Sequence, residues 1–324
     1  MIKAIALFSG GLDSILAVKL VQKQNIDICG LTFTTPFFNA AKAQASARQI
    51  DLPLMVEDFT TQHLQMLKSP RYGYGKNMNP CIDCHTLMLK MAGRKMEETG
   101  ADFLVTGEVL GQRPMSQTKQ SLYVVAKNSG YADYILRPLS AQLLEPVKAA
   151  EREGKVDRLK LLSISGRGRK DQIRLAKEFG IQQYPPPAGG CLLTDPIFSI
   201  RLRDLMSHSE DRQIRDYELL KYGRHFRAGD KGKIIVGRNK ADNEALRQLA
   251  LNVDLVCNMA DFPGPYVLAP YGSESAMTAA AALCVRYSDA PADTEARVVC
   301  LHKNISTTIK AKAIPKEDSE RWII

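Results

Sequence analysis

The sequence has little of what would mark several common classes of protein. It contains one Trp and five His among 324 residues, and no uninterrupted apolar run is long enough to span a bilayer. Its first residues lead directly into an apolar segment and leave no room for a cleavable signal. We find no internal repeat and no low-complexity tract. We therefore expect a cytoplasmic globular chain of two domains, without a membrane partner.

A lysine is also missing where the commonest phosphate-binding loop would carry one. The segment at residues 8–14 reads FSGGLDS, between a short apolar run and a stretch with helical apolar spacing. Adjacent glycines permit positive φ angles and the close approach of an anion, and a helix start directs free N–H groups at it. We expect the turn to hold pyrophosphate through Ser9, Gly10, Gly11 and Ser14.

Apolar runs alternate with helical patterns over the first part of the chain. Runs at residues 2–8, 28–33, 54–56 and 102–106 read as buried strands. The alternation predicts an α/β fold with a doubly wound parallel sheet, whose ligands bind at the carboxyl ends of the strands. The stretch YPPPAGG at residues 184–190 predicts a boundary between domains at 1–187 and 188–324. The second domain reads as a smaller α+β unit.

The seven cysteines fall into two groups, and a reducing cytosol argues against disulfides in either. Four lie in apolar runs and are expected in the core: Cys29, Cys257, Cys284 and Cys300. Three lie beside Pro or Gly: Cys81, Cys84 and Cys191. Pro80 predicts a helix that starts here and runs to about Thr99, so the first two thiols lie in its first turn. There the helix dipole favours the thiolate.

Three more segments are polar or basic. The loop GEVLGQRPMSQT at residues 107–118 follows a predicted strand and belongs to the same crevice as the first loop. Arg167, Arg169 and Lys170 surround Gly168 and can hold the phosphates of a nucleotide or an RNA backbone, and the alternative is a solvated basic helix start. Segment 69–77 fits either a mobile lid or an exposed connection. The net charge of +9, with a further basic patch at 201–203, favours a polyanionic partner or simply a solvated basic surface.

Several of these motifs resemble known families. FSGGLDS resembles the loop of the PP-loop pyrophosphatases, which cleave ATP to AMP and pyrophosphate. GEVLGQRPMSQT resembles a motif of 4-thiouridine synthases, and NPCIDC at residues 79–84 resembles the NPxxxC motif of tRNA 2-thiouridylases. VGRN and GPYVL, at 236–239 and 264–268, resemble the RNA-binding module of NFACT proteins. The 4-thiouridine synthases carry an RNA-binding extension ahead of their phosphate loop. Here the loop begins at residue 8, so we expect the C-terminal module to dock the RNA instead.

The resemblance implies ATP-dependent thiolation of a tRNA uridine, with Mg²⁺ as a cofactor. A carbonyl oxygen would be adenylated, and sulfur would then replace it as AMP leaves. The implied ATP contacts are Ser9, Gly10, Gly11, Asp13, Ser14, Gly107 and Gln112. The implied catalytic residues are Asp13, Cys81, Cys84 and Cys191, and the implied RNA or phosphate contacts are Arg113, Arg167, Arg169 and Lys170. The partners would be tRNA, a sulfur donor (a cysteine desulfurase or free sulfide) and, as an option, a second copy in a homodimer.

Alternatives remain open at two levels. Cys81, Cys84 and Cys191 could bind a [4Fe–4S] cluster, carry and resolve a persulfide, bind zinc together with His85, or be inert. The whole chain could instead be a PP-loop amidase or ligase acting on a small molecule. It could also be an RNA-binding quality-control factor that only senses ATP.

Overall fold

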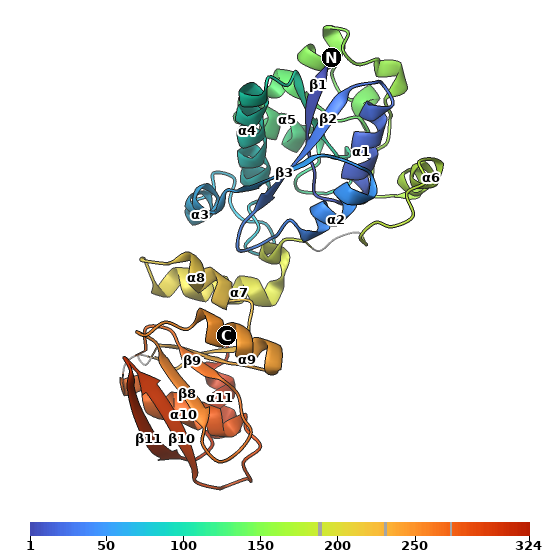
Figure 1. Cartoon of the computed structure of the whole chain (residues 1–324). Helices are drawn as coiled ribbons and strands as arrows, with labels where there is room; N and C mark the ends of the chain where they lie inside the picture. Colours follow the sequence, from blue (N-terminus) through green and yellow to red (C-terminus); the bar gives the residue numbers. More distant parts are fainter. Residues whose placement is uncertain (187–189, 230–231, 273) are drawn as a thin grey trace. The chain divides into compact units, whose positions relative to one another are not determined.

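The computed structural model describes residues 1–186, 190–229, 232–272 and 274–324. It divides into two compact units, Met1–Thr194 and Asp195–Ile324 (Figure 1). The predicted boundary between residues 187 and 188 lies outside the described residues and stays a prediction. Each unit has its own sheet and its own hydrophobic core.

Within the described residues, the N-terminal unit is built on a five-stranded parallel sheet with the order β3-β2-β1-β4-β5. The strands are β1 (Lys3–Leu7), β2 (Asp27–Thr34), β3 (Leu54–Asp58), β4 (Phe103–Thr106) and β5 (Ile135–Leu136). The chain works outward from β1 in both directions, so the predicted doubly wound fold is confirmed. β5 has only two residues, and Pro138, two residues beyond its end, has no N–H to continue the ladder.

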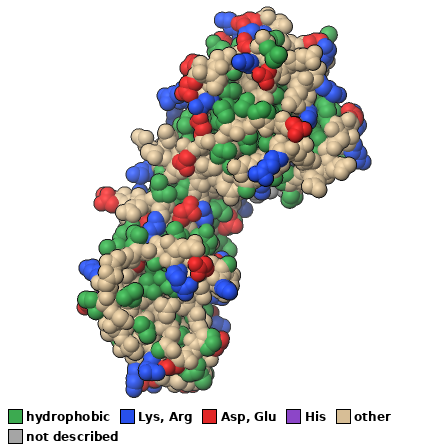
Figure 2. Space-filling view, viewed as in Figure 1, with side chains coloured by type: hydrophobic (Ala, Val, Ile, Leu, Met, Phe, Trp, Pro, Cys, Tyr) green, Lys and Arg blue, Asp and Glu red, His purple; other side chains and the backbone are tan. Residues whose placement is uncertain are grey.

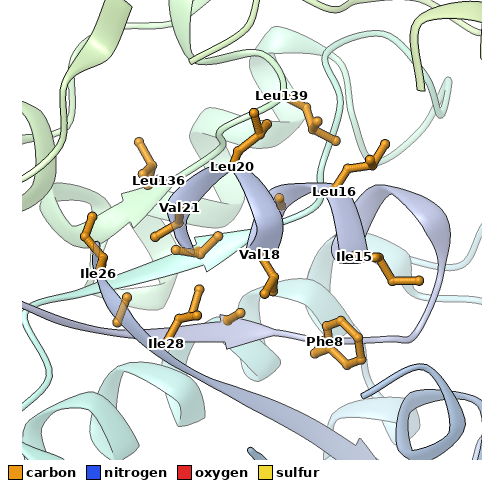
Figure 3. Packing of buried hydrophobic residues seen from close by; sticks show 14 of the residues in the cluster. Phe8, Ile15, Leu16, Val18, Leu20, Val21, Ile26, Ile28, Leu136 and Leu139 are labelled. Carbon is orange, nitrogen blue, oxygen red and sulfur yellow. The ribbon is translucent and has the colours of Figure 1, made fainter. Parts of the chain in front are cut away.

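Helices cover both faces of this sheet (Figure 1). They are α1 (Leu12–Gln22), α2 (Ala41–Gln49), α3 (Thr60–Lys68), α4 (Cys81–Thr99), α5 (Lys119–Ser129) and α6 (Lys170–Glu178). Side chains alternate along β1, so Ala4 and Ala6 join the core under α1, whereas Ile5 joins the core under α4. Figure 3 shows α1 surrounded by apolar side chains, which fixes the loop that precedes it.

In the part of the C-terminal unit that is described, a six-stranded sheet has antiparallel neighbours throughout. Its order is β11-β10-β8-β9-β7-β6. The strands are β6 (Arg224–Arg227), β7 (Lys233–Val236), β8 (Leu255–Met259), β9 (Val267–Ala269), β10 (Ala296–His302) and β11 (Ile305–Ala311). This confirms the predicted α+β class for the second domain.

The helices of this unit are α7 (Pro196–His208), α8 (Ile214–Leu219), α9 (Lys240–Leu249), α10 (Met277–Arg286) and α11 (Lys316–Trp322). The strongly charged stretch at residues 201–222 is divided between α7 and α8. Ser209 and Gln213 are extended and interrupt the helix, and the side chain of Asp216 accepts a bond from the N–H of Gln213 at 2.9 Å to start α8.

Two expectations about single residues are wrong. Cys257, Cys284 and Cys300 are buried as predicted, but Cys29 is only half-buried, because it lies on β2 where its thiol donates to the carbonyl of Pro53 at 3.3 Å. Arg201, placed in a basic patch by its neighbours, is buried. Its guanidinium donates to the carbonyls of Leu220 and Gly223 at 2.9 and 3.0 Å. Arg201 therefore holds backbone in place and is not available to RNA.

On the face that Figure 2 shows, Lys and Arg side chains are dispersed among Asp and Glu and form no single stripe. None of the helices in the described ranges has the length and apolar character needed to cross a bilayer.

Candidate functional site

The loop after β1 has the backbone of an anion-binding turn. Gly10 has φ of +73°, and a Cβ there would lie 2.5 Å from the carbonyl oxygen of Lys42, so no other residue fits without movement. Gly11 is the N-cap of α1, and the helix begins at Leu12. The Ser14 hydroxyl donates to the carbonyl of Gly11 at 2.8 Å. This turn presents the free N–H groups of the first helical turn to a ligand.

Asp13 lies half-buried in that first turn and is incompletely satisfied. Its Oδ2 accepts from Gln112 Nε2 at 3.2 Å, while its Oδ1 is buried with no partner among the described residues. Burial raises the pKa of Asp13, and the Gln112 bond and the charges of Arg169 and Arg113 oppose that rise. A carboxylate oxygen left free beside an anion-binding turn is a suitable ligand for a hard cation such as Mg²⁺.

Segments 107–118 and 165–170 meet beside this turn. The N–H of Gly166 donates to the carbonyl of Leu110 at 2.7 Å, and Leu110 and Ser165 form an isolated parallel bridge. As a result Arg169, the N-cap of α6, and Arg113 both act on Asp13. Arg167 and Lys170 lie on the same segment, both exposed. Of the four predicted phosphate contacts, Arg113 and Arg169 are thus brought near the first loop.

The three thiols come together from two segments. α4 begins at Cys81 and ends at Thr99, as predicted, so Cys81 and Cys84 lie in its first turn. Cys191 reaches them because the next residue, Leu192, donates its N–H to the carbonyl of Phe37, just past the carboxyl end of β2, at 3.0 Å. Cys81 and Cys191 are both near enough to Cys84 to raise the pKa of its thiol, and Cys81 also raises the pKa of Cys191.

The thiols differ from the sequence-based expectation in their acidity. The helix dipole was expected to favour thiolates, yet burial raises the pKa of Cys84 well above its usual value, and the nearby thiols raise it further. Burial and then Cys81 raise the pKa of Cys191 to about 11. Desolvation outweighs the dipole here because a charged sulfur must be taken out of water. Cys84 and Cys191 are therefore protonated at neutral pH unless a positive group accompanies them.

One pair of adjacent residues joins the thiols to the phosphate loop. A Cβ on Gly107 would lie 2.5 Å from the backbone nitrogen of Ser14, so β4 ends directly against the loop. The next residue, Glu108, has its Oε1 at 3.1 Å from Nδ1 of His85, the residue that follows Cys84. Both half-sites therefore lie at the carboxyl edge of one parallel sheet, where such folds bind ligands.

Glu108 is held by a buried ion pair. Arg137 Nε donates to its Oε2 at 2.9 Å, and the guanidinium also donates to the carbonyl of Leu122 at 3.3 Å. Burial raises the pKa of Glu108, but the charge of Arg137 and the bond to His85 outweigh it and bring the pKa to about 2. Glu108 is thus an ionised anchor for His85.

The surroundings of Cys81, Cys84 and Cys191 bear on which metal they could hold. Among the described residues, no set of three or more His, Cys, Asp or Glu side chains is arranged to hold a metal ion. His85 faces Glu108, which removes it from a zinc set with the cysteines. Soft sulfur donors such as these thiols are the ligand type that iron–sulfur clusters take.

Sequence reasoning missed several contacts of the thiols. His63 of α3 lies with Nε2 at 3.5 Å from Cys84 Sγ, and burial lowers its pKa to about 4, so its ring is neutral. Asn79 donates to Cys81 Sγ at 3.3 Å. Asn79 was visible as part of the NPCIDC motif, whereas nothing in the local sequence distinguishes His63, which only the packing of α3 against α4 brings near.

Two family profiles match the chain. Residues 2–153 match the family described as "Thiamine biosynthesis protein (ThiI)". Residues 223–323 match the "NFACT protein RNA binding domain". A curated relative, "Probable tRNA sulfurtransferase" of Thermococcus kodakarensis, is 30% identical over 146 residues, which cover 42% of this chain and 36% of the relative. The chain thus spans about a third of that relative.

Solved structures give weaker likenesses. "Crystal structure of a 4-thiouridine synthetase - RNA complex with bound ATP" has a TM-score of 0.42 and 23% identity, covering 68% of this chain and 52% of the other. The C-terminal part of a fibronectin/fibrinogen-binding protein from Streptococcus suis has a TM-score of 0.29 and 13% identity, covering 75% and 94%. The resemblances expected from the motifs are confirmed by the two profiles: the chain is similar to the ThiI family over its N-terminal part and to the NFACT RNA-binding domain over residues 223–323.

Proposed function

We propose that the protein uses ATP to replace a carbonyl oxygen of a tRNA uridine with sulfur. The observation that carries the proposal is that β4 ends against the phosphate-binding turn at Gly107, while the next residue, Glu108, contacts His85, the neighbour of Cys84 at the start of α4. A turn alone would suit any ATP-dependent ligase. Grouped thiols alone would suit a redox protein. Their junction suits activation of an oxygen followed by its exchange for sulfur.

The nucleotide half rests on the first loop. Ser9, Gly10, Gly11 and Ser14 would hold the pyrophosphate of ATP, with Arg169 neutralising charge that builds up on the phosphates. The free Oδ1 of Asp13 would take Mg²⁺, and Gln112 would keep the other oxygen in place. Placed here, Arg169 serves the nucleotide, and the exposed Arg167 and Lys170 are left for RNA phosphates.

The reaction balances without an added oxidant when sulfide is the donor. The uridine carbonyl oxygen attacks the α-phosphorus, the bond to pyrophosphate breaks, and the base becomes an adenylate. Hydrosulfide then attacks the activated carbon, and the original oxygen leaves on AMP. The target base would be taken out of its stack to reach the site, as enzymes that act on bases generally require.

Cys81, Cys84 and Cys191 would hold a [4Fe–4S] cluster in this scheme. When bound, such a cluster supplies an iron without a protein ligand, at which sulfide can be kept. Asn79 would orient Cys81, and the neutral ring of His63 would exclude water behind Cys84. In the competing scheme one thiol carries a persulfide and a second resolves it as a disulfide, which then needs a thiol reductant.

RNA is the proposed substrate because two independent features agree. The match of residues 223–323 to an RNA-binding domain supplies a docking module, and the net charge of +9 supplies long-range attraction to phosphates. The same match favours a second candidate, an RNA-binding factor that only senses ATP. That candidate needs no thiols near the nucleotide, and so predicts that Cys81→Ser changes nothing.

The test is thiolation by the purified full chain. Protein prepared anaerobically is assayed for iron and acid-labile sulfide, then mixed with unmodified tRNA transcript, ATP and sulfide, and the digested nucleosides are measured by mass spectrometry. We expect a thiouridine that requires ATP and is lost in Asp13→Ala. An iron-free protein that still thiolates with a cysteine desulfurase supports the persulfide scheme. No thionucleoside with either sulfur source overturns the proposal.

A further inference from the structure

The segment between α3 and α4 carries an unusual surface, which we call the tyrosine loop (residues 70–79). Tyr72 and Tyr74 are 42% and 36% exposed, so much of each ring faces solvent. Arg71 precedes Tyr72 and Lys76 follows Tyr74 by two residues, and both cations are exposed. Exposed rings flanked by cations are the surface that unpaired nucleic acid strands bind, because bases stack on the rings while phosphates meet the charges.

This loop is held in place, contrary to one of the two sequence-based options, a mobile lid. The carboxylate of Asp83 accepts the N–H groups of Arg71 and Tyr72 at 3.1 and 2.9 Å. Asn128 of α5 donates to the Tyr72 hydroxyl at 2.7 Å. Tyr72 is therefore tethered at both its backbone and its hydroxyl while 42% of the residue stays exposed, which lowers the entropy cost of stacking on its ring.

The loop also contacts both segments that carry the thiols. Asn79 donates to Cys81 Sγ at 3.3 Å, and Asn77 donates to the carbonyl of Thr194, three residues beyond Cys191, at 2.6 Å. A base delivered to the thiols therefore has its neighbouring nucleotides beside this loop. Among the described residues, neither Arg71 nor Lys76 forms an ion pair with a carboxylate, and the Arg71 guanidinium lies 5.6 Å from the Tyr72 ring centre.

We propose that Tyr72 stacks on an unpaired base next to the target uridine, and that Arg71 and Lys76 hold the phosphates on either side of it. This rests on the proposed function in taking RNA as the substrate, and it adds where the strand lies as it enters the site. The positive side chains suit RNA better than a neutral peptide, and an open aromatic face suits a base of any identity.

The experiment compares two tyrosines in the full chain. Tyr123 on α5 is a matched control, since it is 64% exposed and also lies under a cation, with Lys127 Nζ at 5.9 Å, but is outside the tyrosine loop. Binding of fluorescein-labelled, unmodified tRNA transcript and steady-state thiolation are measured for Tyr72→Ala and Tyr123→Ala. We expect Tyr72→Ala to raise KM and Kd for tRNA roughly tenfold with kcat little changed, and Tyr123→Ala to match the wild type.

Two more variants separate stacking from loop structure. Tyr72→Phe keeps the ring but loses the Asn128 bond, and Asn128→Ala loses the same bond from the other side. Both should bind tRNA within about threefold of wild type if the ring carries the contact. Equal losses in Tyr72→Phe and Tyr72→Ala would mean that the hydroxyl bond matters and would overturn stacking.

The remaining outcomes are distinguishable. If Tyr72→Ala and Tyr123→Ala behave alike, the tyrosine loop does not bind RNA. If Tyr72→Ala slows thiolation only when a cysteine desulfurase supplies the sulfur, and not with free sulfide, the loop docks a protein donor and the proposal is wrong. If the wild type binds tRNA and Tyr72→Ala weakens that binding, but no thiolation occurs, the inference stands and the proposed function fails.

Discussion

Each unit of the chain holds three cysteines close together, and the two trios have opposite surroundings. Cys257, Cys284 and Cys300 lie inside regular elements, β8, α10 and β10, and are buried. Cys257 Sγ lies 3.2 Å from Cys300 Sγ across paired strands, and burial raises the pKa of Cys284 to about 12. Cys81, Cys84 and Cys191 lie at a helix start and in a loop, and are only half-buried.

Three thiols that lie close together do not by themselves form a functional site. The C-terminal trio behaves as small apolar side chains that fill the space between a sheet and α10. The N-terminal trio has polar neighbours, Asn79 and His63, and partial access to solvent. What separates the two is the position of the cysteines at the carboxyl edge of a parallel sheet.

The largest expected effect tests this difference directly. Cys191→Ser removes one of the three proposed sulfur ligands, so thiolation should fall on the order of a hundredfold or more, beyond what removal of a supporting contact usually costs. Cys300→Ala should leave thiolation per folded molecule unchanged. Both are measured by thiouridine formation under anaerobic conditions. ATP binding should be retained in both, and its loss in Cys191→Ser would mean that the nucleotide half had been disturbed instead.

A second effect concerns the ion pair that joins the two half-sites. Arg137→Met leaves the Glu108 carboxylate buried without its main partner, and should destabilise the N-terminal unit by about 3–5 kcal/mol. Arg174→Met is the control, because its ion pair with Glu178 is exposed and should matter by under about 1 kcal/mol. Urea unfolding followed by circular dichroism measures both. Similar midpoints for the two variants would contradict a structural role for Arg137.

The same pair makes a pH prediction. The pKa of Glu108 is about 2 in the folded chain and about 4.3 when unfolded, so the unfolded state takes up the proton first as pH falls. The stability it contributes is complete above pH of about 4.3 and is lost as pH falls towards about 2. Glu108→Gln should therefore show a shallower loss of stability across this range. An unchanged acid profile would contradict the depressed pKa.

The smallest effect belongs to the C-terminal trio. Cys300→Ala removes one buried sulfur and should cost about 1 kcal/mol in that unit alone. Trp322 is the only tryptophan of the chain and packs against the C-terminal core, so its fluorescence reports this unit selectively. A loss of stability confined to the N-terminal unit would show that the two trios had been assigned to the wrong roles.

Local pattern was enough for the elements that frame the site. The FSGGLDS turn, the parallel sheet and the helix from Cys81 to Thr99 follow from glycine positions, apolar spacing and one proline. The turn, the helix and each single strand depend on residues close in sequence, whereas the parallel pairing follows from the alternation of strands and helices along the chain.

What could not be predicted depends on distant contacts. The position of Cys84 in the first turn of a helix predicts a lowered thiol pKa, whereas the pKa is raised. The burial that raises it depends on α3 and on Cys191, which are distant in sequence. Arg201 was taken for a surface cation because its neighbours are charged, whereas the turn at residues 220–223 consumes its guanidinium. Charge and helix position are read from sequence, but desolvation is set by tertiary packing.

The hydrogen bond from Leu192 to Phe37 has a consequence for how the protein is made. Cys191 is synthesised more than a hundred residues after Cys84, at the very end of the first unit. A growing chain can fold its sheet and its nucleotide turn while only two thiols are present. The full set of three thiols therefore exists only once the ribosome has finished the whole unit.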